Sequence, residues 1–327
     1  MKRLLCIVFI GALLGQSAAA ASKSGERAPA TAPFSTSTVS PVEAEFQRLM
    51  AQDDAAHEEV DKWIKDNGAF AKRGAGLSEA VLSLKIEQRL APVKQAYEDF
   101  LQRHPSHARA QLAFGSFLND LGEEAEARKR WEKALDLDPT NPAAYNNLAN
   151  SYGQTGPVAK AFDLYRKAIE INPKQATYYH NLGSVMVLHR KDAAAHYGIP
   201  EPQVVRHAID LYRIAEKFDA ANFQLATDIA QAHYALQPPD HAGALAAWQR
   251  AQTLARDEKE REATHLHLAR VLAAAGRITE ARAQLNSVTN ASLAGIKGLL
   301  TEEFMKKALP APLPEETRRP GNASSPK

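Results

Sequence analysis

The chain repeats a pattern of residue types every 34 positions. The stretch from Gly122 to Pro139 recurs, without a gap, from Gly156 to Pro173. The recurring pairs match in size and type: Gly122 and Gly156, Ala127 and Ala161, Trp131 and Tyr165, Ala134 and Ala168, Leu137 and Ile171, Pro139 and Pro173. A period of about 20–50 residues predicts an array of stacked repeats, because one such repeat cannot bury its apolar face alone.

The order of residue types within one repeat identifies the kind of array. In the second repeat an aromatic, a leucine and a small residue are followed by Gly, Ala, aromatic, Ala and Pro: Tyr145, Leu148, Ala149, Gly156, Ala161, Tyr165, Ala168 and Pro173. This pattern resembles the tetratricopeptide-repeat (TPR) family over residues 108–288. The resemblance implies an all-α fold, a right-handed α-solenoid of helix–turn–helix repeats with helical flanks, whose concave groove binds a protein or peptide.

The glycines of the pattern have two expected roles. Small residues such as Gly115 and Gly183 are expected where the two helices of a repeat approach closely. Glycine is also favoured directly after a helix, because it adopts left-handed backbone angles without strain. We therefore expect Gly122, Gly156 and Gly276 to end the first helices of their repeats in that conformation.

Composition and periodicity divide the chain into six segments. They are a signal peptide at 1–21, a flexible linker at 22–41, an N-terminal helical region with a degenerate repeat at 42–107, the TPR array at 108–288, a capping helix at 289–309 and a disordered tail at 310–327. Regular repeats are expected at 108–141 and 142–175. An insertion at about 192–205 separates the two helices of the third repeat, and its residues Pro200 and Pro202 predict an exposed loop.

The N-terminal helical region contains three local signals. Residues 67–68, an Asn-Gly pair, and then residues 73–76, Arg-Gly-Ala-Gly, predict the end of a first helix. Ser78 is a candidate N-cap for the next helix, because its hydroxyl can accept a hydrogen bond from a free backbone N–H. Pro92 predicts a kink or a second helix start within that segment.

The first 21 residues have the three parts of a secretory signal. Lys2 and Arg3 precede an apolar run at 4–14, and small residues lead to a cleavage site near 20–21. The apolar run is shorter than the ~20 residues that a membrane-spanning helix needs. We therefore expect an exported protein, periplasmic or secreted, with no membrane span in the mature chain; an uncleaved anchor is the alternative.

Removal of the signal changes the charge and the cysteine content. The chain has 40 Lys and Arg against 38 Asp and Glu, so its net charge of +2 equals the contribution of Lys2 and Arg3. The mature chain is then neutral, which argues against a nucleic-acid partner. The single cysteine, Cys6, lies in the apolar run, so no disulfide or thiol chemistry is expected after cleavage.

The sequence contains no recognisable catalytic or metal motif. His57 and Glu58 begin the zinc motif H-E-x-x-H, but Asp61 stands where the second histidine is needed. The other histidines do not cluster at a ligand spacing, and there is no glycine-rich phosphate loop or nucleophile elbow. We predict a non-catalytic protein that uses no metal and no cofactor, with a cryptic enzyme as the least favoured alternative.

Polar side chains recur on the first helices of the second and third repeats. The candidate peptide-binding residues are Asn146, Asn147, Asn150, His180, Asn181 and Ser184. Asn146 and Asn150 are four residues apart and share a helix face, and Asn181 follows Asn146 by one repeat plus one residue. An asparagine amide offers both a donor and an acceptor, which suits an extended peptide backbone.

Other roles for these residues stay open at this point. They can form hydrogen bonds between repeats, or they can make up a solvated helix face. A polar groove also suits a ligand of another class, a glycan or cell-wall polymer, and this is the alternative function. The identity of the partner and the oligomeric state do not follow from the sequence.

Overall fold

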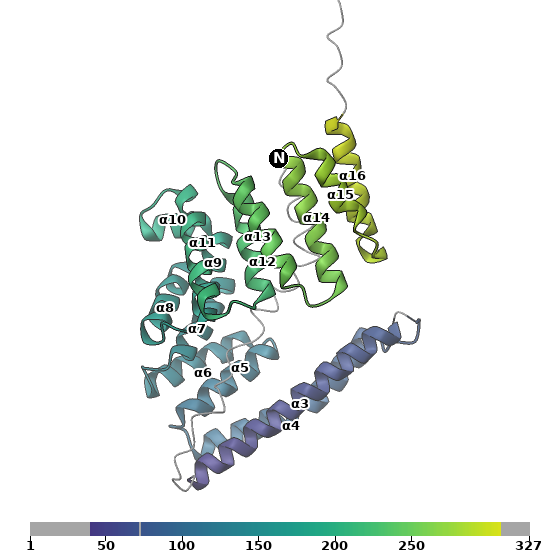
Figure 1. Cartoon of the computed structure of the whole chain (residues 1–327). Coiled ribbons are helices and arrows are strands. Elements are labelled where there is room, and N and C mark those ends of the chain that lie inside the picture. The colour runs from purple at the N-terminus through teal and green to yellow at the C-terminus, as the bar shows by residue number, and fades with distance from the viewer. Residues whose placement is uncertain (1–39, 72, 309–327) are drawn as a thin grey trace, which may run out of the picture. The chain divides into compact units, whose positions relative to one another are not determined.

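The computed structural model describes residues 40–71 and 73–308, with side chains as far as Phe304 in the last helix (Figure 1). Every regular element in these ranges is a helix, so the predicted all-α fold is confirmed. The predicted signal peptide, most of the predicted linker and the predicted tail lie outside the described residues. Within the described part, no helix combines the length and the apolar character needed to cross a bilayer.

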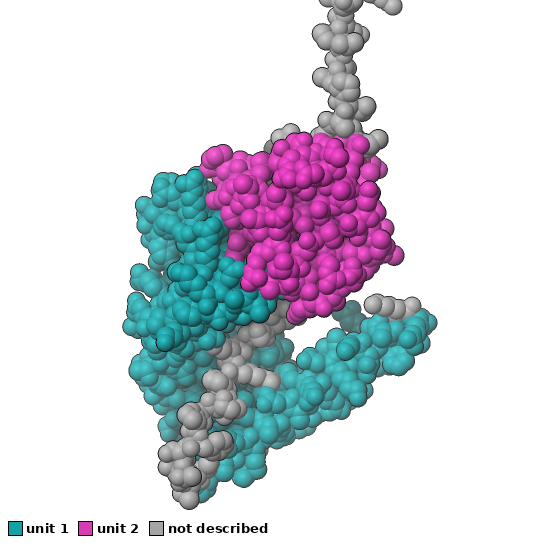
Figure 2. Space-filling view, in the orientation of Figure 1, with its two compact units in different colours: residues 1–228 teal, residues 229–327 magenta. Residues whose placement is uncertain are grey.

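The chain divides into two compact units, residues 1–228 and 229–327 (Figure 2). The helices of unit 1 are α3 (Pro41–Ala71), α4 (Glu79–Arg103), α5 (Ala108–Asp120), α6 (Glu124–Leu137), α7 (Pro142–Thr155), α8 (Val158–Ile171), α9 (Ala176–Leu188), α10 (Arg190–Tyr197) and α11 (Glu201–Phe218). Helix α12 (Phe223–Ala232) crosses the division between the units. Unit 2 then contains η1 (His233–Ala235), α13 (His241–Thr253), α14 (Glu258–Ala274), α15 (Ile278–Asn286), η2 (Ala291–Leu293) and α16 (Ala294–Ala308).

Helix α3 is longer than predicted. The break expected at residues 67–68 is wrong, because the helix continues to Ala71, whereas the break expected at 73–76 is confirmed by a turn there, with Gly74 at φ 76°. The Asn67 side chain does not turn the chain locally; it bonds to the backbone of Leu77 across the hairpin. Its Oδ1 accepts from the Leu77 N–H at 2.6 Å and its Nδ2 donates to the Leu77 carbonyl at 3.3 Å.

Helix α4 starts where predicted and is uninterrupted. The Ser78 hydroxyl accepts from the N–H of Val81, which confirms Ser78 as the N-cap. Pro92 lies inside the helix and does not start a second one. Leu90 and Val93, on either side of it, are buried in the core, and this packing stabilises the helix across the missing N–H.

Close approach between paired helices occurs at the expected glycines. A Cβ atom added to Gly115 on α5 would lie 2.5 Å from the Trp131 ring on α6. One added to Gly183 on α9 would lie 2.7 Å from the Tyr212 ring on α11. Because real side chains do not tolerate contacts this short, both positions require a residue without a side chain.

The turn glycines follow the prediction at two of three positions. Gly122 and Gly276 have φ angles of 79° and 80°, so both adopt the left-handed conformation. Gly156 ends α7 as predicted, but its φ of −127° and ψ of −169° are extended backbone, so the predicted left-handed conformation is wrong there. The physical reason is the next residue, Pro157, because the proline ring restricts the preceding residue to extended angles.

The insertion in the third repeat is not an exposed loop, and that prediction is also wrong. Its first part forms α10, and its end forms the first turn of α11, where Pro202 is tolerated because the N–H groups there have no partner in the helix. Ala193 and Val204 are fully buried and belong to one core cluster with residues of α7, α8 and α9. The insertion is therefore a packed part of unit 1.

Candidate functional site

Helices α7 and α9 carry all six predicted groove residues. Helix α7 begins sharply because the Asn141 side chain accepts from the N–H of Ala143, and Pro142 occupies the first position, where no N–H is needed. The structure brings the four asparagines, Asn146, Asn147, Asn150 and Asn181, into one hydrogen-bonded group. The other two predicted residues have different partners, described below.

Asn181 joins α9 to α7. Its Nδ2 donates to Asn146 Oδ1 at 3.0 Å and to Asn150 Oδ1 at 3.3 Å. Asn146 Nδ2 in turn donates to Asn147 Oδ1 at 3.4 Å. Two consecutive repeats are therefore connected by amide-to-amide hydrogen bonds between their first helices.

The connection extends to α5 and α8. Asn147 Nδ2 donates to Ser116 Oγ on α5 at 3.2 Å, and Ser116 donates to the carbonyl of Leu112 at 3.3 Å. The Tyr165 hydroxyl on α8 donates to Asn150 Oδ1 at 2.6 Å. We refer to Ser116, Asn146, Asn147, Asn150, Tyr165 and Asn181 as the asparagine network; it spans three consecutive repeats.

Burial separates the asparagines into two classes. Asn146 and Asn147 are 1% and 0% exposed, so a partner cannot reach them without unpacking the helices. Asn150 and Asn181 are half-buried. In this structure Asn146 and Asn147 therefore form hydrogen bonds within and between repeats, which is one of the other roles named in the sequence analysis.

Each of the two half-buried asparagines keeps one free polar atom. The oxygen of Asn150 is occupied by Tyr165 and Asn181, whereas its Nδ2 donates to no group in the described ranges. The Nδ2 of Asn181 is occupied by Asn146 and Asn150, whereas its Oδ1 accepts from no described group. One donor on α7 and one acceptor on α9 therefore remain for a ligand.

The protonation of Tyr165 sets the direction of its hydrogen bond. Burial raises the pKa of the Tyr165 phenol well above its usual range, because the charged form is poorly solvated there. The hydroxyl is therefore neutral at physiological pH and acts as the donor to Asn150. The amide of Asn150 is oriented by this bond, so that its Nδ2 is the free end.

His180 and Ser184 on α9 pair with residues outside the asparagine network. His180 Nε2 lies 2.7 Å from Asp228 Oδ2, and the other oxygen of Asp228 accepts from Gln224 at 2.9 Å. Ser184 Oγ lies 3.1 Å from the Tyr212 hydroxyl. The six predicted groove residues are therefore all hydrogen-bonded to other side chains, the asparagines within the asparagine network and His180 and Ser184 outside it.

The sequence pattern includes Tyr165 only as the aromatic residue of the second repeat, and its hydroxyl is not among the predicted groove residues. The equivalent residue of the preceding repeat is Trp131, whose buried Nε1 has no hydrogen-bond partner in the part of the chain that the structure describes. A Tyr in place of Trp at this repeat position provides a hydroxyl group that can reach the first helix of the same repeat. The combination of Tyr165 with Asn150 in one repeat is the signal that could have revealed the pair.

A cavity lies elsewhere in unit 1 and involves none of these residues. It has a volume of about 520 Å³ and surrounds the turn between α5 and α6, with lining residues Gly122, Glu123, Glu124, Ala125, Glu126, Arg128 and Thr155. Glu123 is paired with Lys94, and Arg128 donates to Ser151 and Thr155. With these charges used internally, the asparagine network is the better candidate site.

Comparison with known proteins agrees with the repeat geometry. The family model described as TPR repeat matches residues 115–156, and the tetratricopeptide repeat model matches residues 142–175. No curated protein gives a significant match to the chain. The matched segments include all of α6, α7 and α8 and the C-terminal part of α5.

Two solved structures are similar in fold to a large part of the chain. Pseudomonas aeruginosa PilF is 16% identical, with a TM-score of 0.51, over 77% of this chain and 99% of PilF. YrrB, described as a TPR protein with an unusual peptide-binding site, is also 16% identical, with a TM-score of 0.50, over 65% of this chain and 99% of YrrB. At this identity the likeness concerns the fold alone. Family models, repeat geometry and fold agree that residues 115–175 of this all-α chain are tetratricopeptide repeats.

Proposed function

We propose that this chain is a non-catalytic scaffold that binds an extended peptide segment of a partner protein across α7 and α9. The observation that carries the proposal is the free donor of Asn150 and the free acceptor of Asn181, on neighbouring first helices. An extended peptide presents N–H and C=O groups in alternation along its backbone. One donor and one acceptor on adjacent helices match that alternation.

The buried part of the asparagine network supports binding indirectly. Asn146 and Tyr165 hold the amides of Asn181 and Asn150, respectively, through bonds of 3.0 and 2.6 Å. Side chains held in this way lose little conformational freedom when a ligand arrives, and preorganisation improves affinity for that reason. The TPR repeats themselves support a protein partner, since YrrB is a TPR protein described with a peptide-binding site.

The test is capture of partners from an envelope extract by the purified chain, with bound material identified by mass spectrometry. The variant is Asn150→Ala/Asn181→Ala. Gln203→Ala is the matched control, because it removes an exposed amide on α11 outside the network. Two lost hydrogen bonds, each worth roughly 0.5–1.5 kcal/mol, should weaken binding by about 5- to 150-fold.

Thermal melts of all three proteins separate lost binding from lost folding. The expected result is that wild type and Gln203→Ala recover the same peptides, and that the double variant loses them while it still folds. Equal recovery by a folded double variant would refute the proposed site. Recovery of a sugar polymer in place of peptide would favour the alternative glycan function.

We further propose that the scaffold works in the cell envelope, periplasmic or secreted. The support is the sequence of the first 21 residues, with Lys2 and Arg3 before an apolar run. N-terminal sequencing of the protein from an envelope fraction tests this point. The expected mature N-terminus lies near Ala20 or Ala21, and a chain in that fraction that still begins at Met1 would contradict cleavage.

A further inference from the structure

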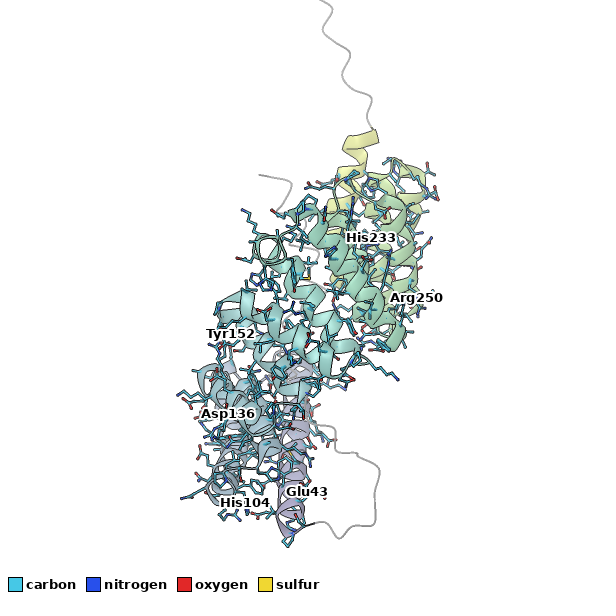
Figure 3. The ribbon with its side chains drawn as sticks, turned by 90° about the vertical axis from the view of Figure 1, so that its left-hand side faces the viewer. Glu43, His104, Asp136, Tyr152, His233 and Arg250 are labelled. Atoms are coloured by element: carbon cyan, nitrogen blue, oxygen red, sulfur yellow. The ribbon has the colours of Figure 1, made fainter. Side chains whose placement is uncertain are left out.

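The polar atoms that the asparagine network offers to a ligand depend on how its amides are turned. An asparagine amide has an oxygen that accepts and a nitrogen that donates, and turning the amide over exchanges their places. The free atoms are the nitrogen of Asn150 on α7 and the oxygen of Asn181 on α9. Tyr152, labelled in Figure 3, lies on the same helix as Asn150 and marks this part of unit 1. The groups that hold these two amides in place therefore decide what a ligand meets.

One end of the asparagine network is a group that can only accept. The carbonyl oxygen of Leu112 on α5 accepts from Ser116 Oγ at 3.3 Å. Because the Ser116 hydroxyl has a single proton, its oxygen must act as the acceptor in the contact with Asn147. Asn147 therefore turns its nitrogen toward Ser116, at 3.2 Å, and its oxygen toward Asn146. Ser116, Asn146 and Asn147 are all buried, so this end of the network is closed to a ligand.

The direction of this first bond is passed from one amide to the next. Asn147 Oδ1 can only accept, so Asn146 presents its nitrogen to it at 3.4 Å and keeps its oxygen for Asn181. Asn181 consequently presents its nitrogen to Asn146, at 3.0 Å, and to Asn150, at 3.3 Å. The oxygen of Asn150 is then occupied and its nitrogen is left. A carbonyl buried on α5 thus determines, through four amides, which atoms are free on α7 and α9.

The other end of the asparagine network favours the same orientation. The buried Tyr165 donates its hydroxyl proton to Asn150 Oδ1 at 2.6 Å. In the reverse arrangement Asn150 would present its nitrogen to Tyr165, and the hydroxyl proton would lose this acceptor. Ser116 would likewise have to turn its proton from Leu112 toward Asn147. A buried hydroxyl proton without an acceptor is costly, so Ser116 and Tyr165 together oppose reversal of the amides.

A fixed donor and a fixed acceptor distinguish the two directions of an extended peptide. Such a peptide presents an N–H and a C=O at the same edge of its backbone. Its N–H meets the oxygen of Asn181, and its C=O meets the nitrogen of Asn150. A peptide turned end for end about the same residue would set its N–H against the nitrogen and its C=O against the oxygen, and neither contact is a hydrogen bond. The residue that supplies the N–H cannot be proline, which has none.

We propose that Ser116 and Tyr165 are positioning residues that hold the four amides in one orientation and thereby make the site bind an extended peptide in one direction only. The inference rests on the proposed function, because it concerns the same site. Both side chains are 3% exposed, so they act through the asparagines and not by contact with the ligand. The ligand class is an extended segment whose anchored residue has a free backbone N–H.

The orientation of the amides can be measured without a ligand. Hydrogen exchange of the side-chain amide protons is followed by NMR on the full chain labelled with ¹⁵N, and the Asn150→Ala and Asn181→Ala variants assign the two signals. We expect the protons of Asn181 to exchange slowly, since its nitrogen is bonded to two oxygens, and those of Asn150 to exchange faster. Equal rates, or the reverse order, would overturn the orientation on which the inference depends.

The direction of the ligand is measured by photo-cross-linking. Peptides of twelve residues are selected on the wild-type chain from a random library displayed on phage. One selected peptide is synthesised with a photoreactive group at its N-terminus or at its C-terminus, and mass spectrometry locates the cross-linked residues. We expect each label to react on one side of the site only, one with α5 and the other with residues 223–228 of α12, which adjoin α9 through the contact of Asp228 with His180.

Two double variants separate positioning from folding. The positioning variant is Ser116→Ala/Tyr165→Phe. The matched control, Ser151→Ala/Tyr212→Phe, removes a buried serine hydroxyl of α7 and the tyrosine hydroxyl of the following repeat, both outside the asparagine network. Far-UV circular dichroism and thermal melts check that each variant folds.

A single isosteric substitution tests the same orientation if the positioning variant does not fold. Asn150→Asp keeps an oxygen for Tyr165 and Asn181 but places a second acceptor where the free donor was. We expect it to fold and to bind the selected peptide more weakly by on the order of ten-fold or more. Binding as tight as that of the wild type would overturn the inference, because the exposed atom of Asn150 would then not be a donor.

In the control we expect the wild-type order of exchange rates and one-sided cross-links. In the positioning variant the two exchange rates should approach each other, and each label should react on both sides of the site. A wild-type chain that binds the peptide in both directions would overturn the inference, as would a folded positioning variant that behaves like the control. If the folded wild type selects no peptide, the proposed function fails and the peptide direction with it, while the exchange rates still decide whether Ser116 and Tyr165 orient the amides.

Discussion

His267 should make the folding of unit 2 sensitive to acid. Its side chain on α14 is 3% exposed and stacks on Trp248, with ring centres 3.9 Å apart and an angle of 7° between the planes. Its Nε2 has no partner in the described part of the chain, and its Nδ1 lies 3.4 Å from the Tyr234 hydroxyl. Burial, with a smaller effect from the nearby Arg270, lowers the pKa of His267 from 6.5 to about 3.

The sign and size of the effect follow from this shift. The unfolded chain binds the proton more tightly, since its histidine pKa is near 6.5. The stabilising contribution of neutral His267 is therefore complete above about pH 6.5 and is lost as the pH falls from there toward 3. At pH 5 the loss is 1.5 pKa units at about 1.4 kcal/mol each, or about 2 kcal/mol.

Urea melts at pH 7.5 and pH 5, followed by circular dichroism and tryptophan fluorescence, measure this loss. The comparison protein is His267→Phe, which keeps a ring beside Trp248 but cannot titrate. Because all other titrating groups are common to both proteins, their contributions cancel in the difference. We expect the wild type to lose about 2 kcal/mol more than the variant between the two pH values. Equal losses in the two proteins would show that His267 is not held neutral by burial.

Two further predictions concern Gly183 and Asn147 in unit 1, and Gly298 in unit 2 is the control for the first. Gly183→Ala should destabilise the chain by about 1–3 kcal/mol, because its Cβ would meet the Tyr212 ring at 2.7 Å. Gly298→Ala on α16, where nothing lies within 4 Å, should be neutral or stabilising in the same denaturant melts; similar midpoints for the two variants would contradict the close approach. Asn147→Ala should cost about 1–3 kcal/mol, because it leaves the buried hydroxyl of Ser116 without its donor; an unchanged melting temperature would show that this bond contributes nothing.

The array itself could be predicted because its determinants are local and repeated. Glycines such as Gly122 and Gly115 mark a turn and a close approach, and their spacing is visible without any knowledge of tertiary structure. The predictions of local structure were wrong where residues next to the predicted feature changed the backbone conformation. Pro157 forces Gly156 into extended backbone, and the alanines of the insertion form a helix despite its prolines.

The candidate site was harder to predict, for a different reason. Asn146 and Asn150 do share a helix face with Asn181 opposite them, as the repeat spacing indicates. Whether an asparagine faces solvent or a neighbouring repeat depends on the distance between the packed helices. That distance cannot be predicted from the sequence pattern. The exposed fraction of 0% for Asn147 is a property of the assembled repeats.

The asparagine network limits how freely this array can change by gain or loss of repeats. Apolar contacts between repeats tolerate substitution, since many side-chain shapes fill the same gap. Arrays whose repeats are joined by apolar contacts alone are therefore nearly modular. A buried amide, in contrast, needs its particular partner at its particular place. Ser116, Asn147 and Asn181 belong to three successive repeats, and Asn146 completes the hydrogen-bonded chain between Asn147 and Asn181. These repeats therefore cannot be shuffled or duplicated without leaving buried polar atoms unpaired. The middle of the chain should accordingly be inherited as one block, while length variation among relatives falls outside it.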